Sequence, residues 1–386
     1  MKRQRKLDAL RGFMQPPPMD LITHAAVGAA IGEMMLGKRM GNRALAWGAM
    51  FGILPDLDVL LAPVLDTARY LAWHRGPSHS LLVMIAASWF LSPWLAKRWK
   101  KDKISRALAG WFVFTIWMTH VLIDCFTVYG TSVLWPLPVA RIAFNTLFII
   151  DPLFTLPMLI ALVWLAFLRT KKQLTKRRRL NVLGLGISTS YALLAIGMKF
   201  VASAGFEADL ARRSVNCQRR METPTPFNIL LWRSVVDCGD AYWIGYRSVF
   251  ENRTTPVRWT IYPKGKAALS GMEKMREVRT LEKFSDGWWI ARPHAQGAWL
   301  ADVRFCEMRR WGDKKTMVDS RFPFCWDILP DARGDRLRTV TSDRRDSSVM
   351  LSKMTRRIFG NRADWEANPR LAGVTGSLPE YLAVQE

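Results

Sequence analysis

Histidine and aspartate residues recur among apolar segments of this chain at spacings that suit metal coordination. The sequence of 386 residues holds only five histidines, and four of them fall within its first 120 residues. Charged carboxylates at bilayer depth cost about 2.5–3.5 kcal/mol each and are normally kept for function. A metal centre at a membrane face would account for these carboxylates, because metal ligation offsets the cost of placing them there. The candidate ligands are His24, Asp56, Asp58, His74, His79, His120 and Asp124.

The spacing of these residues favours shared ligation. His120 and Asp124 are four positions apart, so on a helix both point from one face toward one ion. His74 and His79 flank a Gly-Pro pair, whose turn can bring the two imidazoles together. A mixed imidazole and carboxylate set suits zinc, manganese or iron better than calcium or magnesium, and zinc is preferred here. The number of groups predicts two or more ions.

Each ligand also has an interpretation without a metal. His120 and Asp124 could form a hydrogen-bonded pair on a helix surface. Asp56 and Asp58 follow a proline and could form a turn that breaks a helix at the membrane interface. Their joint placement on one membrane face favours the metal centre.

Three further residues are candidates for catalysis. The carboxylate of Asp20 or Asp151 could act as a general base if it is not fully engaged by metal. Either aspartate could instead cap or open a helix. Arg75 could hold a substrate phosphate, or it could anchor lipid headgroups.

Composition divides the chain near residue 206. The first part carries 25 Lys/Arg against 9 Asp/Glu, and the remainder carries 31 against 23. The basic residues of the first part concentrate in short loops beside apolar runs, as membrane-topology signals do, which argues against nucleic acid as a partner. We predict a basic tail at 1–19, a membrane-embedded metal-site domain at 20–206 and a soluble α+β domain at 207–386.

Six apolar segments could enter a bilayer, where a full span needs about 20 apolar residues. The first is short and carries Glu33, and the second is broken at Pro55, so four to six membrane helices are expected. The segments are roughly 21–37, 44–65, 79–96, 107–123, 147–168 and 181–204.

The distribution of positive charge predicts the orientation of these helices. Three loops on one side hold 3, 6 and 7 Lys/Arg, whereas the tail and two loops on the other side hold 5, 2 and 1. The positive-inside rule places the first group in the cytoplasm and every candidate ligand at the extracytoplasmic face. The basic tail conflicts with this arrangement unless the first segment does not fully cross. The more basic loops are 38–43, 97–106 and 169–179, and the others are 66–78 and 124–146.

The C-terminal part of the chain has a different pattern. Aromatic-rich, alternating runs at 241–250, 257–262 and 298–305 predict strands, and 266–283 and 347–359 predict helices. A mixed α+β domain is therefore expected after the membrane region.

Four cysteines of this part form an even set, namely Cys217, Cys238, Cys306 and Cys325. Outside the cytoplasm they predict one or two disulfides, with a connectivity that spacing does not define. Four unpaired core thiols are the alternative.

Four blocks of sequence resemble the YdjM/YbcI-type membrane-bound metal-dependent hydrolases, also described as LexA-binding, inner-membrane-associated hydrolases. Ser78 stands where threonine is usual, and Val59 stands where some members have a further histidine. The resemblance covers about residues 20–170. The blocks are TH at 23–24, LPDLD at 54–58, HRGPSHSL at 74–81 and THVLID at 119–124, followed by LWP at 134–136.

The resemblance implies an α-helical integral protein of the bacterial inner membrane, with kinship to the zinc-dependent phospholipase C and nuclease fold. It also implies that the seven candidate ligands hold clustered metal. We therefore predict a metal-dependent hydrolase that acts on a phosphoester or lipid-linked substrate by metal-activated water. The alternative is a non-catalytic membrane protein with a structural metal site and a partner-binding soluble domain. A transporter is disfavoured, because the motifs cluster at one face.

Overall fold

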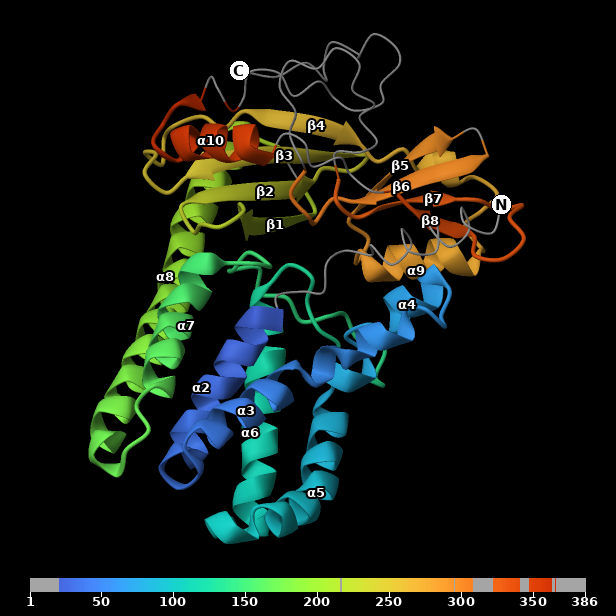
Figure 1. The fold of residues 1–386 in the computed structure, drawn as a ribbon. Helices are drawn as coiled ribbons and strands as arrows, with labels where there is room; N and C mark the ends of the chain where they lie inside the picture. The colour runs from blue at the N-terminus through green and yellow to red at the C-terminus, as the bar shows by residue number, and fades with distance from the viewer. Residues whose placement is uncertain are drawn as a thin grey trace. The chain divides into compact units, whose positions relative to one another are not determined.

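The computed structural model describes residues 21–215, 217–294, 296–307, 322–340, 347–362 and 365 (Figure 1). Packing divides the described chain into two compact units. The helical unit comprises residues up to 61 and residues 73–195, and the β-rich unit comprises residues 62–72 and the chain from 196 onward.

The helical unit is built from segments whose ends follow local capping signals. Ser80 caps α5 by accepting from the Val83 amide at 3.2 Å, and Asp151 caps α7 by accepting from the Leu153 amide at 3.1 Å. Its helices are α2 (Leu21–Met40), α3 (Asn42–Ile53), η1 (Pro55–Leu61), η2 (Pro77–His79), α5 (Leu81–Arg98), η3 (Lys100–Asp102), α6 (Arg106–Phe126), α7 (Pro152–Ala166), η4 (Lys171–Gln173) and the first part of α8 (Leu174–Arg212).

Helices α2 and α3 cross at glycines, which let the two backbones approach closely. A Cβ atom added to Gly28 would lie 2.3 Å from the carbonyl oxygen of Gly48, and one added to Gly52 would lie 2.3 Å from that of His24. Glycines four residues apart on each helix form the small-residue pattern typical of helix pairs in membranes. The crossing therefore brings the end of α3 against the turn of α2 that carries His24.

A buried ion pair joins α2 to α8. Arg177 donates from Nε and Nη2 to the two carboxylate oxygens of Glu33, both at 2.6 Å. Its Nη1 donates to Asn42 Oδ1 at 2.6 Å and to the carbonyl oxygens of Leu165 and Leu168 at 3.1 Å. One guanidinium thus contacts α2, the start of α3 and the end of α7, and it is fully enclosed.

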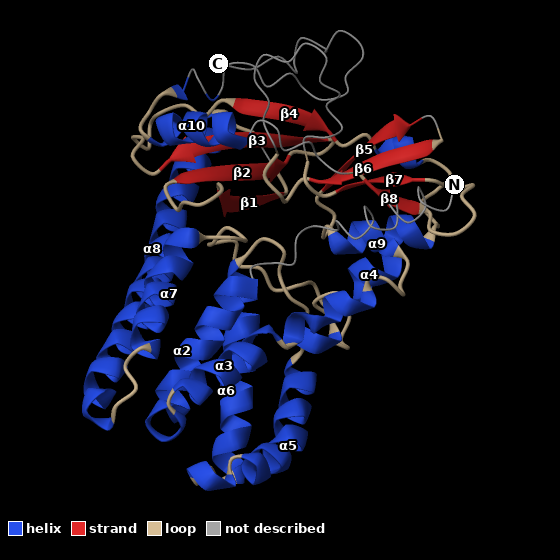
Figure 2. Ribbon diagram, viewed as in Figure 1, coloured by secondary structure: helices blue, strands red, loops and turns tan. Residues whose placement is uncertain are grey.

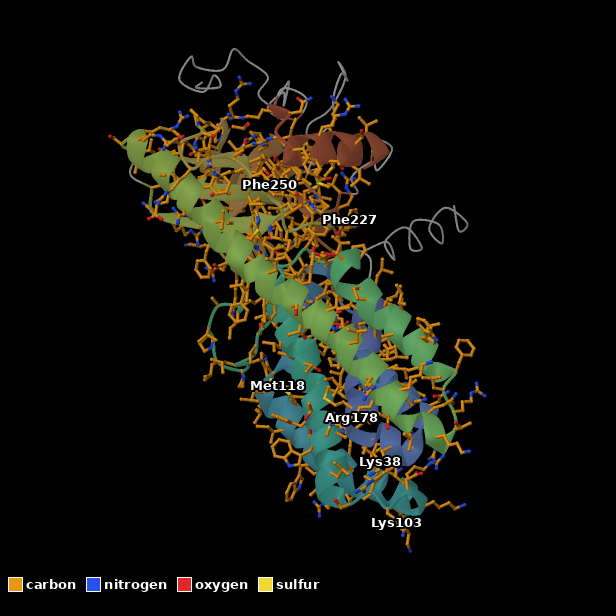
Figure 3. The ribbon with its side chains drawn as sticks, turned by 90° about the vertical axis from the view of Figure 1, so that its left-hand side faces the viewer. Lys38, Lys103, Met118, Arg178, Phe227 and Phe250 are labelled. Atoms are coloured by element: carbon orange, nitrogen blue, oxygen red, sulfur yellow. A yellow bond between two sulfur atoms is a disulfide. The ribbon has the colours of Figure 1, made fainter. Side chains whose placement is uncertain are left out.

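Three basic turns meet at one end of the helical unit. Arg39 of the α2–α3 turn donates to the carbonyl oxygen of Lys103 in the α5–α6 turn at 2.7 Å. Arg177, near the start of α8, donates to Asn42 at the start of α3, and this contact brings the region after the α7–α8 turn to the same end of the unit. Figure 3 labels Lys38, Lys103 and Arg178 at this end.

The membrane-spanning part of the prediction is confirmed. Among the described residues, α6 and α8 are each long and apolar enough to cross a bilayer. The count rises to four if each of two bent pairs forms one span: α3 with η1, bent by 50°, and residues 67–79 with α5, bent by 54°. Four is also the lower bound predicted from the sequence. The fifth apolar segment yields only the 15-residue α7, because the helix begins at Pro152.

The β-rich unit contains two four-stranded antiparallel sheets, whose strands are red in Figure 2. The strands predicted at 241–250, 257–262 and 298–305 are present as β3, β4 and β6. The first sheet has the order β1 (Arg219–Pro224), β2 (Leu231–Asp237), β3 (Ala241–Ser248), β4 (Trp259–Pro263), and the second has β5 (Trp289–His294), β6 (Gly297–Asp302), β7 (Cys325–Ile328), β8 (Leu337–Thr339).

The helices of this unit cover the sheets, which explains why every residue of β2 is buried. Phe206, near the end of α8, packs with Trp232 and Trp259 of the first sheet. Ser248 of β3 donates to the carbonyl oxygen of Ile358 in α10 at 2.7 Å. The predicted helix at 266–283 is divided into η5 and α9. The helices are α4 (Thr67–Trp73), η5 (Lys266–Leu269), α9 (Arg276–Phe284) and α10 (Ser347–Ile358).

One disulfide is formed, between Cys217 and Cys238. It ties the residue before β1 to the turn between β2 and β3. Among the described residues, Cys125, Cys306 and Cys325 are not part of a disulfide. Two of the four cysteines in the predicted set therefore form a disulfide.

Candidate metal centre

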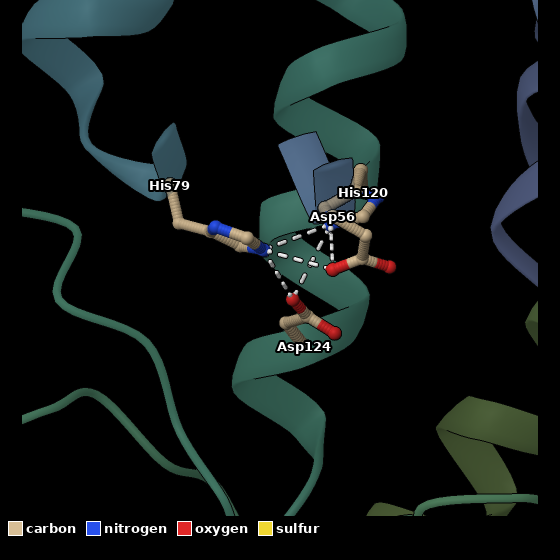
Figure 4. Close-up of side chains that lie close together, drawn as sticks. All are labelled: Asp56, His79, His120 and Asp124. Atoms are coloured by element: carbon tan, nitrogen blue, oxygen red, sulfur yellow. Dashed lines mark hydrogen bonds and ion pairs between the residues drawn. The ribbon is translucent and has the colours of Figure 1, made fainter. Parts of the chain in front are cut away.

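Four predicted ligands converge from three segments of the helical unit (Figure 4). Asp56 lies on η1, which begins where Pro55 ends α3, because proline cannot continue the helix hydrogen bonds. His79 ends η2, and His120 and Asp124 lie one turn apart on α6. All four side chains are buried. The i, i+4 spacing on α6 thus aims both of its side chains at one point, as the sequence predicted.

Five distances among these four side chains are close to those of a tetrahedral metal site, and all four ligand atoms lie within 4.8 Å of one another. His79 Nε2 lies 3.3 Å from Asp56 Oδ1, 3.2 Å from Asp124 Oδ2 and 3.1 Å from His120 Nε2. His120 Nε2 lies 3.5 Å from Asp56 Oδ1 and 3.4 Å from Asp124 Oδ2. Ligands about 2.0–2.1 Å from a tetrahedral zinc ion are separated by about 3.3 Å. Four atoms at these separations can bind one ion with little rearrangement.

A bound cation would stabilise the buried carboxylates of this cluster. Within the described part of the chain, three carboxylate oxygens of the cluster have no hydrogen-bond partner: both oxygens of Asp56 and Oδ2 of Asp124. A buried carboxylate without compensation costs several kcal/mol. The residues therefore fit a bound divalent ion.

Both histidines of the cluster are held with Nε2 facing the centre. Nδ1 of His120 lies 2.7 Å from the carbonyl oxygen of Gly52, which can only accept, so Nδ1 carries the proton. Ser78 Oγ donates to Asp58 Oδ2 at 2.9 Å and therefore accepts from His79 Nδ1, also at 2.9 Å. Each Nε2 therefore has a lone pair that can bind a metal. A hydrogen bond from Nδ1 to a neighbouring group is typical of histidine metal ligands.

Asp58 and His74, two further predicted ligands, lie beside the cluster and not in it. Asp58 Oδ1 lies 2.9 Å from His74 Nδ1, and Oδ2 accepts from the amide of Arg75 and from Ser78 at 2.9 Å. These contacts hold residues 74–79 in the turn that positions His79. In this arrangement Asp58 contacts the turn that carries His79, and its role as a metal ligand stays a prediction.

His24 lies on the other side of the cluster. Its ring stacks on that of His120 with centroids 3.8 Å apart, and its Nε2 lies 3.1 Å from Asp124 Oδ1. Its Nδ1 is buried and has no hydrogen-bond partner among the residues that the structure describes. His24 thus contacts a ligand carboxylate through its other oxygen.

Arg75 approaches the same carboxylate oxygen. Its Nη2 donates to Asp124 Oδ1 at 2.5 Å, and its guanidinium lies 5.0 Å from the centre of the Tyr129 ring. The side chain is only 1% exposed, yet the described residues offer no partner to its Nε and Nη1. Arg75 also has a φ of 57°, a region that side chains other than glycine rarely adopt. Arg75 therefore has a strained backbone conformation and two buried donors, Nε and Nη1, without a hydrogen-bond partner among the described residues.

A small polar pocket lies at this position. Its volume of about 20 Å³ is enough for one water molecule. It is lined by charged, polar and apolar residues, namely Thr23, His24, Arg75, Ile123, Asp124, Thr127, Leu147, Phe148, Ile149, Asp151 and Phe154. We call it the polar pocket.

Asp151, one of the two predicted bases, lines the polar pocket. Its Oδ1 caps α7, and both of its oxygens accept from the hydroxyl of Tyr191, at 3.2 and 3.0 Å. Asp20, the other predicted base, lies outside the described residues. Sequence reasoning did not single out Tyr191, Gly52 or Ser78 as contributors to the site. Only Ser78 had a signal, since it stands inside a motif.

Replacing Ser78 by alanine is expected to weaken metal binding about 10- to 100-fold, because it removes the group that orients His79. Ser78→Thr, which keeps the hydroxyl, should retain wild-type affinity. The measurement is competition with a chromophoric chelator, and Ser88→Ala is the matched control, since Ser88 bonds only within α5. Equal affinity for Ser78→Ala and wild type would contradict this orienting role.

The fold and the site define a membrane protein with a buried His/Asp cluster that could hold a metal. The family model described as YdjM inner membrane protein matches residues 19–204, and over these residues the chain is similar to that family. The family assignment made from the four motifs is thereby confirmed. The chain is also similar to inner membrane protein YbcI of Escherichia coli (strain K12), with 33% identity over 119 residues. This match covers 30% of the chain and 66% of YbcI. No solved structure matches the chain.

Proposed function

We propose that this protein is a membrane-bound metal-dependent hydrolase whose metal ligands are Asp56, His79, His120 and Asp124. The observation that carries the proposal is the polar pocket against Asp124, which is lined by Arg75 and His24, two residues that each have buried nitrogens without a hydrogen-bond partner among the described residues. A purely structural metal site has no need of such donors. A divalent ion held there, preferably zinc, would lower the pKa of a bound water toward about 7 and act as a Lewis acid.

The residues of the polar pocket have separate roles in this proposal. Arg75 binds an anionic oxygen of the substrate through Nε and Nη1, while its Nη2 stays on Asp124. Asp151 is the general base, held in place by Tyr191 and by the first turn of α7. Asp20 remains the alternative base. A phosphoester fits these groups, because the pocket pairs cationic donors with a nearby carboxylate.

The proposed location is the extracytoplasmic face of the inner membrane. The three basic turns lie together at one end of the helical unit, as cytoplasmic loops do. The Cys217–Cys238 disulfide supports an oxidising compartment for the β-rich unit.

A non-catalytic role is the second candidate, and the ligand count favours it. Four protein ligands at tetrahedral separations leave no vacant corner, which is typical of structural zinc sites. In this case the metal holds η1, η2 and α6 together, and the β-rich unit binds a partner.

Hydrolysis of bis-p-nitrophenyl phosphate by the detergent-purified protein distinguishes the two candidates. We expect metal-dependent turnover that a chelator abolishes, and a loss of about 100-fold or more in Arg75→Gln, which removes a transition-state contact. Arg39→Gln, at the basic end, is the matched control and should retain full activity. Metal-loaded, folded protein that hydrolyses neither this probe nor lipid phosphoesters would support the structural role instead.

A further inference from the structure

The segment between α6 and α7 contains a hairpin whose tip, residues 134–140, is apolar and exposed. We call these residues the apolar tip. Its sequence is LWPLPVA, every residue is exposed, and none carries a charge. Thr131 and Ile142 close the base of the hairpin, since the amide of each donates to the carbonyl oxygen of the other, at 3.1 and 2.9 Å. An apolar patch that stays exposed on a folded protein marks a surface for a partner protein or a membrane.

The base of the hairpin is fixed to the turn that carries His79. The amide of Ser132 donates to the carbonyl oxygen of Arg75 at 3.1 Å. The amide of Leu81, the first residue of α5, donates to the carbonyl oxygen of Val133 at 2.9 Å. The apolar tip therefore extends from a base that bonds both to the turn between the two histidines and to the start of α5.

The backbone of the apolar tip satisfies its own hydrogen-bond donors. The amides of Trp135, Leu137 and Val139 donate to carbonyl oxygens within the hairpin, at 3.0, 3.0 and 2.8 Å. The two residues between them are prolines, which have no N–H group. A backbone donor without a partner is costly in hydrocarbon, whereas water would satisfy it at a wetted surface. From residue 135 to residue 139 the backbone thus offers no free donor to its surroundings, as contact with lipid requires.

The charge distribution separates this hairpin from the other turns of the helical unit. No charged residue lies between Asp124 and Arg141. The turns at 38–43, 97–106 and 169–179 hold 3, 6 and 7 Lys/Arg. Those turns have the composition of loops in water, and the apolar tip does not.

The apolar tip lies at the end of α5 where an exposed apolar helix face begins. Leu82, Ile85 and Trp89 are all more than half exposed, and their spacing places them on one side of α5. This helix, together with residues 67–79, is apolar enough to form one bent membrane span. Because Leu81 is bonded to the hairpin base, one apolar medium can contact both this helix face and the apolar tip.

We infer that the apolar tip inserts into the boundary between the headgroups and the acyl chains of the bilayer. Trp135 lies at the level of the headgroups, where tryptophan is enriched, and Leu137 contacts the acyl chains. The hairpin base bonds the turn at 74–79, so insertion of the tip fixes the depth of His79 in the membrane. This anchoring goes beyond the proposed function and does not depend on hydrolysis.

The test is electron paramagnetic resonance of the full chain in phosphatidylcholine nanodiscs, with a nitroxide attached at Leu137→Cys. The background is Cys306→Ser, because the remaining native cysteines are buried or disulfide-bonded. The experiment compares collisions of the nitroxide with oxygen, which enters hydrocarbon, and with a polar nickel chelate, which stays in water. Asp331→Cys, in the exposed turn between β7 and β8, is the reference for water. Leu183→Cys, at a 59% exposed position of α8, is the reference for a membrane span.

We expect the oxygen-to-nickel ratio at Leu137 to exceed that at Asp331 by about tenfold or more, because hydrocarbon excludes polar solutes. The ratio at Leu183 should be high as well. A ratio at Leu137 equal to that at Asp331 would overturn the inference, because the tip would then lie in water. Low accessibility to both reagents would overturn it too, because a protein surface, of the β-rich unit or of a second copy, would then cover the tip.

Discussion

Asp56→Ala protein is expected to lose the metal ion that the wild-type chain retains through purification. In the proposed site the Asp56 carboxylate is one of the four metal ligands, and neither of its oxygens has a hydrogen bond among the described residues. Because loss of an orienting neighbour alone weakens metal binding about 10- to 100-fold, loss of a direct ligand should weaken it by more. Elemental analysis of the detergent-purified protein measures the effect directly.

The control for this experiment is Asp286→Ala, which removes a carboxylate from the surface of the β-rich unit. It should keep the wild-type metal content. The four-residue cluster could hold a metal, and the two or more ions expected from the sequence stay a prediction. A second ion would require His24, Asp58 or His74 to leave its present partner. Metal-free wild-type protein, after metal has been supplied, would refute the metal centre.

Removing one partner of the Glu33–Arg177 pair is expected to destabilise the helical unit by about 3–5 kcal/mol, because the other charge is left buried. Glu33→Leu leaves the guanidinium without its bidentate acceptor, and Arg177→Met leaves the carboxylate unpaired. The double variant should recover most of the loss, since no uncompensated charge remains. Unfolding in mixed micelles, followed by tryptophan fluorescence, gives the free energies for a double-mutant cycle.

The matched control is the Arg43–Asp102 pair, whose arginine is half exposed. Breaking it should change the free energy of unfolding by no more than about 1 kcal/mol. If the Glu33 and Arg177 variants behave like this control, the buried pair does not hold α2 to α8.

The sequence was most informative where local geometry decides the outcome. The four-residue spacing of His120 and Asp124 holds on any helix, and α6 is long and apolar enough to be recognised without a structure. The break before Asp56 follows from Pro55. The resemblance to the family could be inferred from motif order alone, and three strands of the C-terminal part, β3, β4 and β6, followed from their alternation.

Other features depend on contacts between distant segments and could not be predicted. Asp58 and His74 have the same chemistry as the ligands, and only the folded turn shows that they bond each other. The carbonyl oxygen of Gly52 can accept from His120 because it lies in the last turn of α3, where carbonyls have no partner within the helix. This backbone contact leaves no chemical signature in the motif.

The two oxygens of Asp124 face different ligand sites. One contacts the histidines of the metal cluster, and the other contacts Arg75 and His24 at the polar pocket. Occupancy of one site must therefore change the affinity of the other, and thermodynamic linkage makes the two changes equal. An anion on Arg75 lessens the repulsion between its guanidinium and the nearby cation, so the coupling is positive. Inorganic phosphate should tighten metal binding by the same factor by which the metal tightens phosphate binding.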